Sequence, residues 1–395
     1  MSARITRRAF AVGAAAAPLV AAGAESPAAA AEGTGRPVFR RLPDLPANRT
    51  AWNAAIPVRE DYWRQIGLAG MVVGAHGGYL IAAGGANFPE PALTATRANT
   101  LGKIYWADAF VMGPDRTWLD GSLSLPDALA YAACVSTADG VVVIGGEGFR
   151  GGPNGAALAT VTKFADVIRL RYDPAGHRLV REKLPDLPRP MSYAVAALIG
   201  KKLYVAEGAD FYALDLARPG DGWRTLPTWP GPARSVAVGA AADGRFYLVS
   251  GRAADAHGTW HFYRDAYAYD PRTATWSTLT ELPWCVTAGL AWPVGDGRHL
   301  LLAGGDKDLA RWNLIQRQTA AGHKDAVTWI YDHHTGFNGE LLLYDTHRDR
   351  WRVVGDFPGP SQVTTPAVRW GDDLVIVSGE VRPGIRTPAV WAVRP

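Results

Sequence analysis

GYLIAAGG (Gly78–Gly85) is the first of six short apolar runs in this chain that end in a glycine pair or a close variant of one. Apolar runs of this length, bounded by glycine, are typical of buried β-strands. The other five runs are GVVVIGG (Gly140–Gly146), KLYVAEG (Lys202–Gly208), RFYLVSG (Arg245–Gly251), HLLLAGG (His299–Gly305) and DLVIVSG (Asp373–Gly379).

The sequence around each run follows one pattern. A stretch of small residues precedes it, and a tyrosine-rich strand follows, often ending in Tyr-Asp as at Tyr172-Asp173, Tyr269-Asp270 and Tyr344-Asp345. A tryptophan-containing strand and a proline hinge complete the unit. A unit made only of strands and recurring roughly every 40 to 70 residues is typical of a propeller blade. We therefore expect one all-β, six-bladed β-propeller, because blades bury their faces only against one another.

Each expected blade is a four-stranded antiparallel sheet whose first strand lines a central channel. The sixth blade lacks an outer strand before the chain ends. VFRRLPDLP (Val38–Pro46) matches the outer-strand pattern of REKLPDLP (Arg181–Pro188), so we expect the N-terminal strand to close the last blade. The expected blades are Leu68–Ser122, Ala128–Pro188, Met191–Pro230, Arg234–Pro283, Val286–Pro358 and Thr364–Val393. In the first of them the outer strand is expected at Thr117–Ser122, which contains Trp118.

Residues 1–31 have the pattern of an export signal. A twin-arginine motif, Thr6–Phe10, precedes an apolar stretch and a small-residue cleavage region that ends near Ala31. Export by the twin-arginine route to the periplasm or the exterior is expected, with an uncleaved anchor as the alternative. Residues 32–395 form the propeller, interrupted by an insertion at 306–338. Helices are expected in that insertion within Asp308–Gly322 and at Lys324–Tyr331.

Charge and composition narrow the partners. The net charge is +4 and no run of basic residues forms a stripe, so no nucleic-acid partner is expected. No later stretch has the length of a membrane span, so no stable membrane insertion is expected after signal cleavage. A monomer or weak dimer is expected. Cys134 and Cys285 fall in different blades, and both are expected to be buried free thiols because a disulfide needs Cα atoms within about 7 Å.

The loops that follow the glycine pairs and the hinges between blades should converge over one mouth of the channel, where a scaffold of this kind carries its chemistry. Glu380 follows the last glycine directly, and Arg386 stands six residues on, across a Pro383-Gly384 turn. The turn can present both groups to one ligand. The alternative is an ordinary ion pair that fixes the loop. The wider set of polar candidates is Asn48, Arg49, Asn87, Glu147, Arg189, Asp210, Arg234, Arg252, Asp306 and Lys307.

Three stretches carry a family resemblance. GGYLIAAGGANFPEP (Gly77–Pro91), GKIYWADAFVM (Gly102–Met112) and GEVRPGIRTPAV (Gly379–Val390) resemble the kelch-type sialic acid mutarotases, also called N-acetylneuraminate epimerases. In better-known members the Gly-Glu run precedes the Gly-Gly-Ala run, so the chain is similar to a circularly permuted branch. The resemblance implies a proton acceptor at Glu380 and an essential arginine at Arg386. Asn87, Glu147 and Arg252 are proposed as substrate-binding residues from their loop positions.

The resemblance implies an isomerase that interconverts the α and β anomers of a free sugar, most readily N-acetylneuraminate. Opening the ring needs a base on the anomeric hydroxyl and an acid on the ring oxygen. A bidentate arginine suits the substrate carboxylate. No metal or organic cofactor is expected.

Two other classes of function remain open from the residues alone. The first alternative is a non-catalytic kelch module that binds carbohydrate or protein. A copper radical oxidase is disfavoured, because neither cysteine lies in a recognisable copper-binding set. A metal site at His323, His333 and His334 is also disfavoured, since their spacing fits no defined ligand signature.

Overall fold

The computed structural model describes residues 36–49, 65–88, 103–151, 160–295 and 297–394. Contacts join Thr34–Pro395 into one compact unit. The expected signal segment lies outside the described residues. Within them, no helix combines the length and hydropathy needed to cross a membrane.

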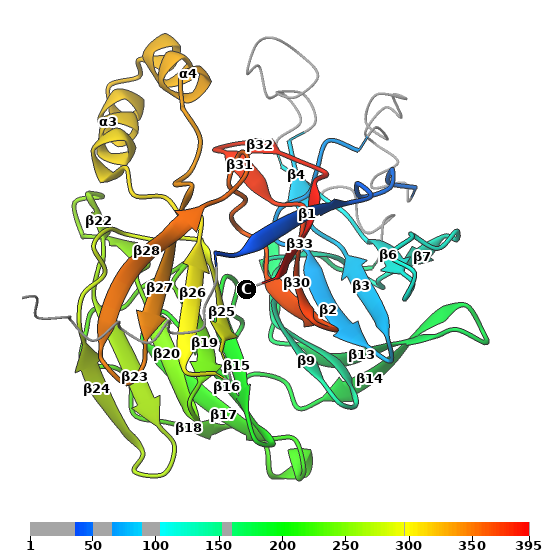
Figure 1. Ribbon diagram of the computed structural model, residues 1–395. Coiled ribbons are helices and arrows are strands. Elements are labelled where there is room, and N and C mark those ends of the chain that lie inside the picture. The colour runs from blue at the N-terminus through cyan, green and yellow to red at the C-terminus, as the bar shows by residue number, and fades with distance from the viewer. Residues whose placement is uncertain (1–35, 50–64, 89–102, 152–159, 296, 395) are drawn as a thin grey trace, which may run out of the picture. The chain divides into compact units, whose positions relative to one another are not determined.

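Six four-stranded antiparallel sheets dominate this unit (Figure 1). The first three are β2 (Val72–His76), β3 (Tyr79–Ala83), β6 (Asp108–Met112) and β7 (Leu123–Ser124); β9 (Ala133–Thr137), β10 (Gly140–Ile144), β13 (Val167–Asp173) and β14 (Arg178–Leu184); and β15 (Val195–Ile199), β16 (Lys202–Glu207), β17 (Asp210–Asp215) and β18 (Arg224–Thr225).

The second half of the chain repeats this order, except that the last sheet takes one strand from the N-terminal region. These sheets are β19 (Val238–Ala242), β20 (Arg245–Val249), β23 (Ala266–Asp270) and β24 (Thr275–Leu279); β25 (Leu290–Val294), β26 (His299–Ala303), β27 (Glu340–Asp345) and β28 (Arg350–Asp356); and β29 (Ala367–Trp370), β30 (Asp373–Val377), β33 (Val390–Arg394) and β1 (Val38–Leu42).

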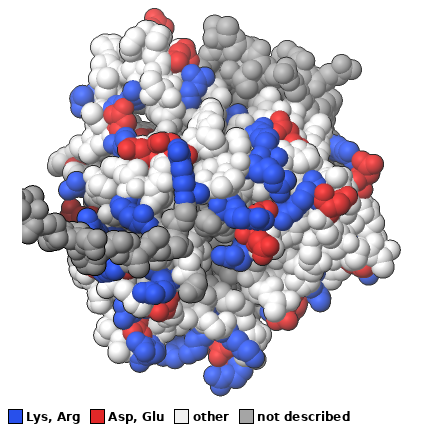
Figure 2. Space-filling view, viewed as in Figure 1, with Lys and Arg blue, Asp and Glu red and all other residues white. Residues whose placement is uncertain are grey.

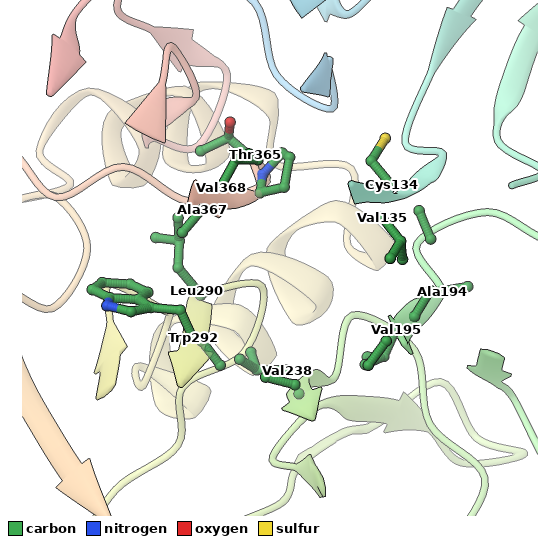
Figure 3. A pocket seen from close by; sticks show the side chains of 18 of the residues that line it. Cys134, Val135, Ala194, Val195, Val238, Leu290, Trp292, Thr365, Ala367 and Val368 are labelled. Atoms are coloured by element: carbon green, nitrogen blue, oxygen red, sulfur yellow. The ribbon is translucent and has the colours of Figure 1, made fainter. Parts of the chain in front are cut away.

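The first strands of the six sheets lie side by side. β2 contacts β9, β9 contacts β15, and the contacts continue through β19, β25 and β29, which in turn contacts β2. This all-β arrangement is of the propeller type. The six strands surround a cavity of about 410 Å³. Figure 3 shows Cys134, Val195, Val238, Leu290 and Val368 around it.

The glycine pairs are required by close backbone approach. Gly84 and Gly145 have φ of 63° and 61°, and a Cβ on them would lie 2.2 Å from the Leu129 carbonyl oxygen and 2.4 Å from that of Met191. Serine replaces the first glycine at Ser250 and Ser378. The Ser378 hydroxyl accepts a hydrogen bond from the Leu68 amide at 2.7 Å, which ties the last sheet to the first.

One residue per sheet has a left-handed backbone just before the first strand. Its amide bonds to the carbonyl of the equivalent residue in a neighbouring sheet at five of the six positions, from Gly70 to Thr364, Tyr131 to Gly70, Tyr193 to Tyr131, Ala288 to Val236 and Thr364 to Ala288. Non-glycine residues pay a steric cost for such φ values. Because the position recurs, this strain belongs to the fold. The six residues, with φ between 48° and 68°, are Gly70, Tyr131, Tyr193, Val236, Ala288 and Thr364.

The insertion between β26 and β27 contains two helices, as the sequence predicts. They are α3 (Leu309–Ala320), N-capped by Asp308, and α4 (Lys324–Asp332). α3 contacts β22 (Trp260–Phe262). A 3₁₀ turn, η1, covers Pro219–Asp221.

Two details differ from the sequence expectation. The outer strand expected at 117–122 is displaced: β7 pairs with β6 at Leu123–Ser124, and Trp118 forms only an isolated bridge to Met112. Both cysteines are free, but Cys134 is half-buried because it lines the cavity.

On the face shown in Figure 2, acidic and basic side chains are interspersed.

Candidate functional site

Short two- and three-stranded sheets begin directly after the glycine pairs and carry the candidate site. In each short sheet, the residue directly after the glycine pair bridges to the segment that leads into the first strand of the adjoining four-stranded sheet. The Ser235–Arg252 and Val363–Glu380 bridges are examples. Three of these positions hold ionisable residues, namely Glu147, Arg252 and Glu380. The short sheets are β4 (Ala86–Asn87) with β5 (Ile104–Tyr105); β8 (Ala128–Ala130), β11 (Glu147–Phe149) and β12 (Thr162–Lys163); β21 (Arg252–Ala254) with β22; and β31 (Glu380–Arg382) with β32 (Ile385–Arg386).

Glu380 and Arg386 face each other across the β31–β32 hairpin. Arg386 Nη1 lies 3.4 Å from Glu380 Oε1, and the same carboxylate oxygen accepts a hydrogen bond from the Gly384 amide at 2.6 Å. The turn expected at Pro383-Gly384 therefore fixes the carboxylate directly. This brings together the two residues that the motif singles out.

The Arg386 guanidinium is buried, with 3% of its side chain exposed. Its carbon lies 4.7 Å from the centre of the Phe88 ring. Nε and Nη1 make no hydrogen bond to any described residue, since the contact with Glu380 has ion-pair distance without hydrogen-bond alignment. Buried donors of this kind are costly when left without an acceptor. Arg386 thus retains capacity for an anionic or carbonyl ligand.

Glu147 belongs to a second cluster. Its two carboxylate oxygens accept hydrogen bonds from the Tyr105 hydroxyl at 2.7 Å and the Ser192 hydroxyl at 3.0 Å, and Lys103 Nζ lies 3.8 Å away. Burial, then the hydrogen bond and charge of Glu147, raise the pKa of the Tyr105 phenol, and the Arg386 guanidinium partly opposes them. The phenol is therefore neutral at physiological pH and lies within electrostatic range of Arg386.

Two tyrosines lie beside this second cluster and border the cavity. The rings of Tyr131 and Tyr193 stack with centroids 4.2 Å apart, and both side chains border the cavity. The Lys103 ammonium lies 4.7 Å from the Tyr131 centroid. A flat aromatic pair beside charged groups suits the apolar face and the hydroxyls of a sugar.

Arg252 lies at the position in the fourth sheet that Glu380 occupies in the last. Its guanidinium carbon is 4.7 Å from the ring centroid of Trp260 and 4.4 Å from that of Trp312 on α3. Burial lowers its pKa, against the charges of Asp306 and Glu380. Arg252 and Glu380 therefore lie within electrostatic range of each other.

Asn87 differs from the other candidates because its side chain is used within the fold. It is 1% exposed, its Oδ1 accepts a hydrogen bond from Trp106 Nε1 at 3.0 Å, and its Nδ2 donates to the Gly67 carbonyl at 3.2 Å.

Most of the remaining polar candidates are held in ion pairs. Arg189 pairs with Glu207 and Asp210, Arg234 with Asp265, and Lys307 with Glu340. Asp306 accepts hydrogen bonds from the Trp312 indole and the Asp308 amide. No group of three or more metal-ligating side chains forms among the residues that the structure describes.

Sequence reasoning missed the aromatic part of the site. Tyr105 lies in the quoted GKIYWADAFVM stretch, but its partner Glu147 is 42 residues away. Tyr131 and Tyr193 stand at the same place in successive repeats, just before the first strand of each sheet. Aligning the repeats at that position is the signal that would have found them.

The family model described as N-acetylneuraminate epimerase matches residues 184–394, which is more than half of the chain and includes Arg252, Glu380 and Arg386. The chain belongs to the N-acetylneuraminate epimerase family. It is 34% identical over 216 residues to an N-acetylneuraminate epimerase of Haemophilus influenzae (strain PittEE), covering 51% of this chain and 57% of that protein. With the Brucella melitensis epimerase it shares 32% identity over 237 residues, covering 55% and 61%.

A solved structure titled "Structure of YjhT" is 26% identical to this epimerase-family chain and covers 52% of it and 62% of the other chain, with a TM-score of 0.47. The chain spans less than two thirds of the length of the curated relatives named above.

Proposed function

We propose that this protein is a mutarotase that interconverts the anomers of a free sugar acid, with N-acetylneuraminate as the leading substrate. The observation that carries the proposal is the Glu380–Arg386 pair, which lies on one hairpin inside the segment matched by the epimerase family. A carboxylate beside a buried guanidinium that retains unused donors can act on an anomeric hydroxyl and an adjacent anion together.

In the proposed reaction Glu380 accepts the proton of the anomeric hydroxyl. The electrons of that O–H bond form the carbonyl, the bond between the anomeric carbon and the ring oxygen breaks, and the ring oxygen takes up a proton. Rotation about the single bond that joins the carbonyl carbon to the sugar chain then turns the opposite face of the carbonyl toward the hydroxyl. The reverse steps close the ring on that face and give the other anomer. Arg386 donates hydrogen bonds to the substrate carboxylate, which lies on the anomeric carbon.

We further propose that the six sheets are the blades of one closed, kelch-type ring in a circularly permuted order. The contact of β29 with β2 and the pairing of β1 with β33 support closure. The permuted order is supported by the match to 184–394 alone and by the contact of Arg386 with Phe88, which follows the Gly-Gly-Ala run.

Two further proposals concern export and oligomeric state. We propose export by the twin-arginine route with cleavage near Ala31, and function as a monomer or weak dimer. N-terminal sequencing of the exported protein tests the first, and sedimentation equilibrium tests the second. Recovery of a chain that still begins at Met1 from the membrane would overturn the cleavage proposal.

The function is tested by saturation-transfer NMR of N-acetylneuraminate, which measures exchange between anomers. The wild-type protein should exceed the buffer rate, and Glu380→Gln should lower the enzymatic rate by a factor of roughly 10² to 10⁴, as expected for loss of a proton-transfer group. A non-catalytic carbohydrate-binding module would broaden the ligand signals without any exchange above buffer. That result, or a Glu380→Gln variant with wild-type rate, would reject the proposal.

A further inference from the structure

Arg252 differs from Arg234 and Arg189 because it forms no ion pair with a described carboxylate. Arg234 forms two contacts with the Asp265 carboxylate, one of them at 2.8 Å, and Arg189 reaches Glu207 at 2.8 Å. No carboxylate oxygen of a described residue lies within 4.0 Å of the Arg252 guanidinium. Within the described part of the chain, the charge of Arg252 therefore has no direct counter-ion.

Aromatic rings occupy the flanks of this guanidinium instead. Trp260 and Trp312 lie within 5 Å of its carbon, and the centroid of Phe262 is 5.8 Å away. Aromatic rings attract a guanidinium through its charge and do not pair its N–H groups as a carboxylate does. Arg252 is half-buried, so part of the residue is exposed to solvent.

Asp306 and Glu380, the two acids whose charges act on Arg252, are bound to other groups. Asp306 accepts hydrogen bonds from the indole of Trp312 and from the Asp308 amide at 2.9 Å. Glu380 is paired with Arg386. These contacts hold both carboxylates away from direct pairing with Arg252.

Arg386 offers a weaker net attraction for an incoming anion. Its charge is partly balanced by Glu380 at 3.4 Å, and a substrate carboxylate that approaches Arg386 also meets the negative charge of Glu380. A second positive charge offsets this repulsion. Arg252 is the candidate because it holds the position in the fourth sheet that Glu380 holds in the last, each bridged to the segment before the first strand.

We infer that Arg252 is the specificity-determining residue of the site: its guanidinium, packed against Trp260 and Trp312, selects sugars with a carboxylate on the anomeric carbon over neutral sugars. This inference rests on the proposed function. Glu380 acts on the anomeric hydroxyl of any bound sugar and Arg386 contacts the substrate carboxylate, whereas Arg252 supplies a second positive charge that only an acid uses.

The insertion gains a role from this assignment. α3 brings Trp312 onto Arg252, and a reciprocal pair of hydrogen bonds between Asn313 and the Trp260 backbone, at 2.9 and 3.2 Å, fastens α3 to β22. The insertion thereby fixes the Trp312 ring to the strand that carries Trp260, with the two ring centroids 6.2 Å apart. Trp312 is a positioning residue for Arg252.

The test compares N-acetylneuraminate with its methyl ester, which has the same ring but no carboxylate charge. Each rate is measured by anomer exchange relative to buffer. Arg252→Gln should lower kcat/KM for the acid by about 10- to 100-fold, mainly through KM, since hydrogen bonds to charged groups are of this strength. For the ester the change should stay within about threefold. An equal loss on acid and ester, or no loss on either, would overturn the inference.

Two further variants separate charge recognition from folding. Arg252→Lys retains the charge without the planar fork, and should keep part of the preference for the acid. Trp329→Ala is the matched control, because it removes an exposed indole from α4, in the same insertion, and should leave both substrates unchanged. Trp312→Ala should shift the ratio of acid to ester in the direction of Arg252→Gln, with kcat on the ester retained.

A binding measurement on the wild-type protein needs no variant to fold. The methyl glycoside of N-acetylneuraminate cannot open its ring, and calorimetry should show it binding at least about tenfold more tightly than the methyl ester of the same glycoside. Equal affinities would reject the role of Arg252. Absence of anomer exchange in the wild type would instead reject the proposed function, so the two failures are distinct.

Discussion

The Asn87 amide joins two segments of the site at the scale of a single residue. Its oxygen receives the indole N–H of Trp106, which is 2% exposed, and its nitrogen reaches the Gly67 carbonyl. Both ends are thus satisfied inside the protein. A substrate hydroxyl could bind Asn87 only by displacing one of these partners.

Replacing Asn87 with Ala should therefore affect stability more than substrate binding. The change removes the acceptor of a buried indole, and a buried donor without a partner costs about 1–3 kcal/mol. Urea unfolding measures the loss, and anomer exchange under the same conditions gives KM. A KM increase of tenfold or more with unchanged unfolding would show that Asn87 binds substrate directly.

The sequence could locate some site residues and not others, for a geometric reason. Glu380 and Arg386 stand six residues apart across a Pro-Gly turn, so local chain geometry alone makes them neighbours. The partner of Tyr105 is 42 residues distant, and sheet pairing decides that contact. For Asn87 the loop position was visible, but the face of a strand to which a side chain points depends on register.

At the scale of elements, Asp373 at the start of β30 connects three segments. Its buried carboxylate lies 3.5 Å from Arg40 on β1, 3.3 Å from Arg116 in the β6–β7 connection and 3.3 Å from Arg394 on β33. Arg116 also stacks on the Trp370 ring, with its guanidinium carbon 3.8 Å from the centroid. One acid thus holds together the first sheet, the last sheet and the N-terminal strand.

Asp373→Asn should destabilise the protein by roughly 1–3 kcal/mol. The estimate is kept low because the side chains of Arg40 and Arg394 are mostly exposed, and solvent screens exposed charges. Thermal unfolding measures the effect. The adjacent Asp372 is exposed and provides the control, Asp372→Asn, which should unfold like the wild type. Equal effects of the two substitutions would contradict the role of Asp373 as a junction.

The insertion should lose stability in acid through His334. Burial, then the charge of Arg311, lowers the pKa of this imidazole from its usual 6.5; Asp306 and Asp308 oppose the shift, and Arg382 adds to it. The neutral Nδ1 accepts a hydrogen bond from the Gly336 amide at 3.0 Å. A group whose pKa is lower in the folded state binds more protons when unfolded, so stability falls as the pH drops below about 6.5.

Hydrogen exchange of α3 and α4 at pH 7.5 and 5.5, corrected for intrinsic rates, measures this change. Protection in the two helices should be lower at pH 5.5 in the wild type, and the pH dependence should shrink in His334→Gln. If protection is equal at both pH values, His334 does not control the insertion.

Local sequence patterns predicted the helices of the insertion but not the outer strand of the first sheet. The two helices could be predicted because Asp308 caps the first and the turn at Gly322 ends it, and both signals are local. The outer strand of the first sheet was misplaced. Trp118 resembled the tryptophans of other outer strands, but its indole donates to the Pro43 carbonyl at 3.1 Å, and pairing with β6 resumes only at Leu123. That contact comes from the N-terminal segment, which no local pattern reveals.

At the scale of the whole molecule, the N-terminal strand covers the edge of the last sheet. β1 pairs with β33 along five residues, and Phe39 lies edge-on to Phe357 and Trp391 at 5.0 and 6.3 Å. Leu42 and Leu45 are each 3% exposed. Without β1, Phe357 and Trp391 lose the Phe39 ring that packs on them, and β33 becomes a free edge. A free edge favours association with other strands.

A chain shortened to begin at Ala47 should therefore unfold at lower denaturant and associate. Loss of the two buried leucines and of Phe39 removes roughly 5 kcal/mol of apolar burial. Because β33 belongs to the same sheet as β30, the disturbance should extend to the β31–β32 hairpin between them and lower anomer exchange. Urea unfolding and size-exclusion chromatography measure stability and association, and a chain that begins at Thr34 is the control because it keeps β1. If the shorter chain stays monomeric with the same unfolding midpoint and exchange rate as this control, pairing with β1 is not what maintains the last sheet.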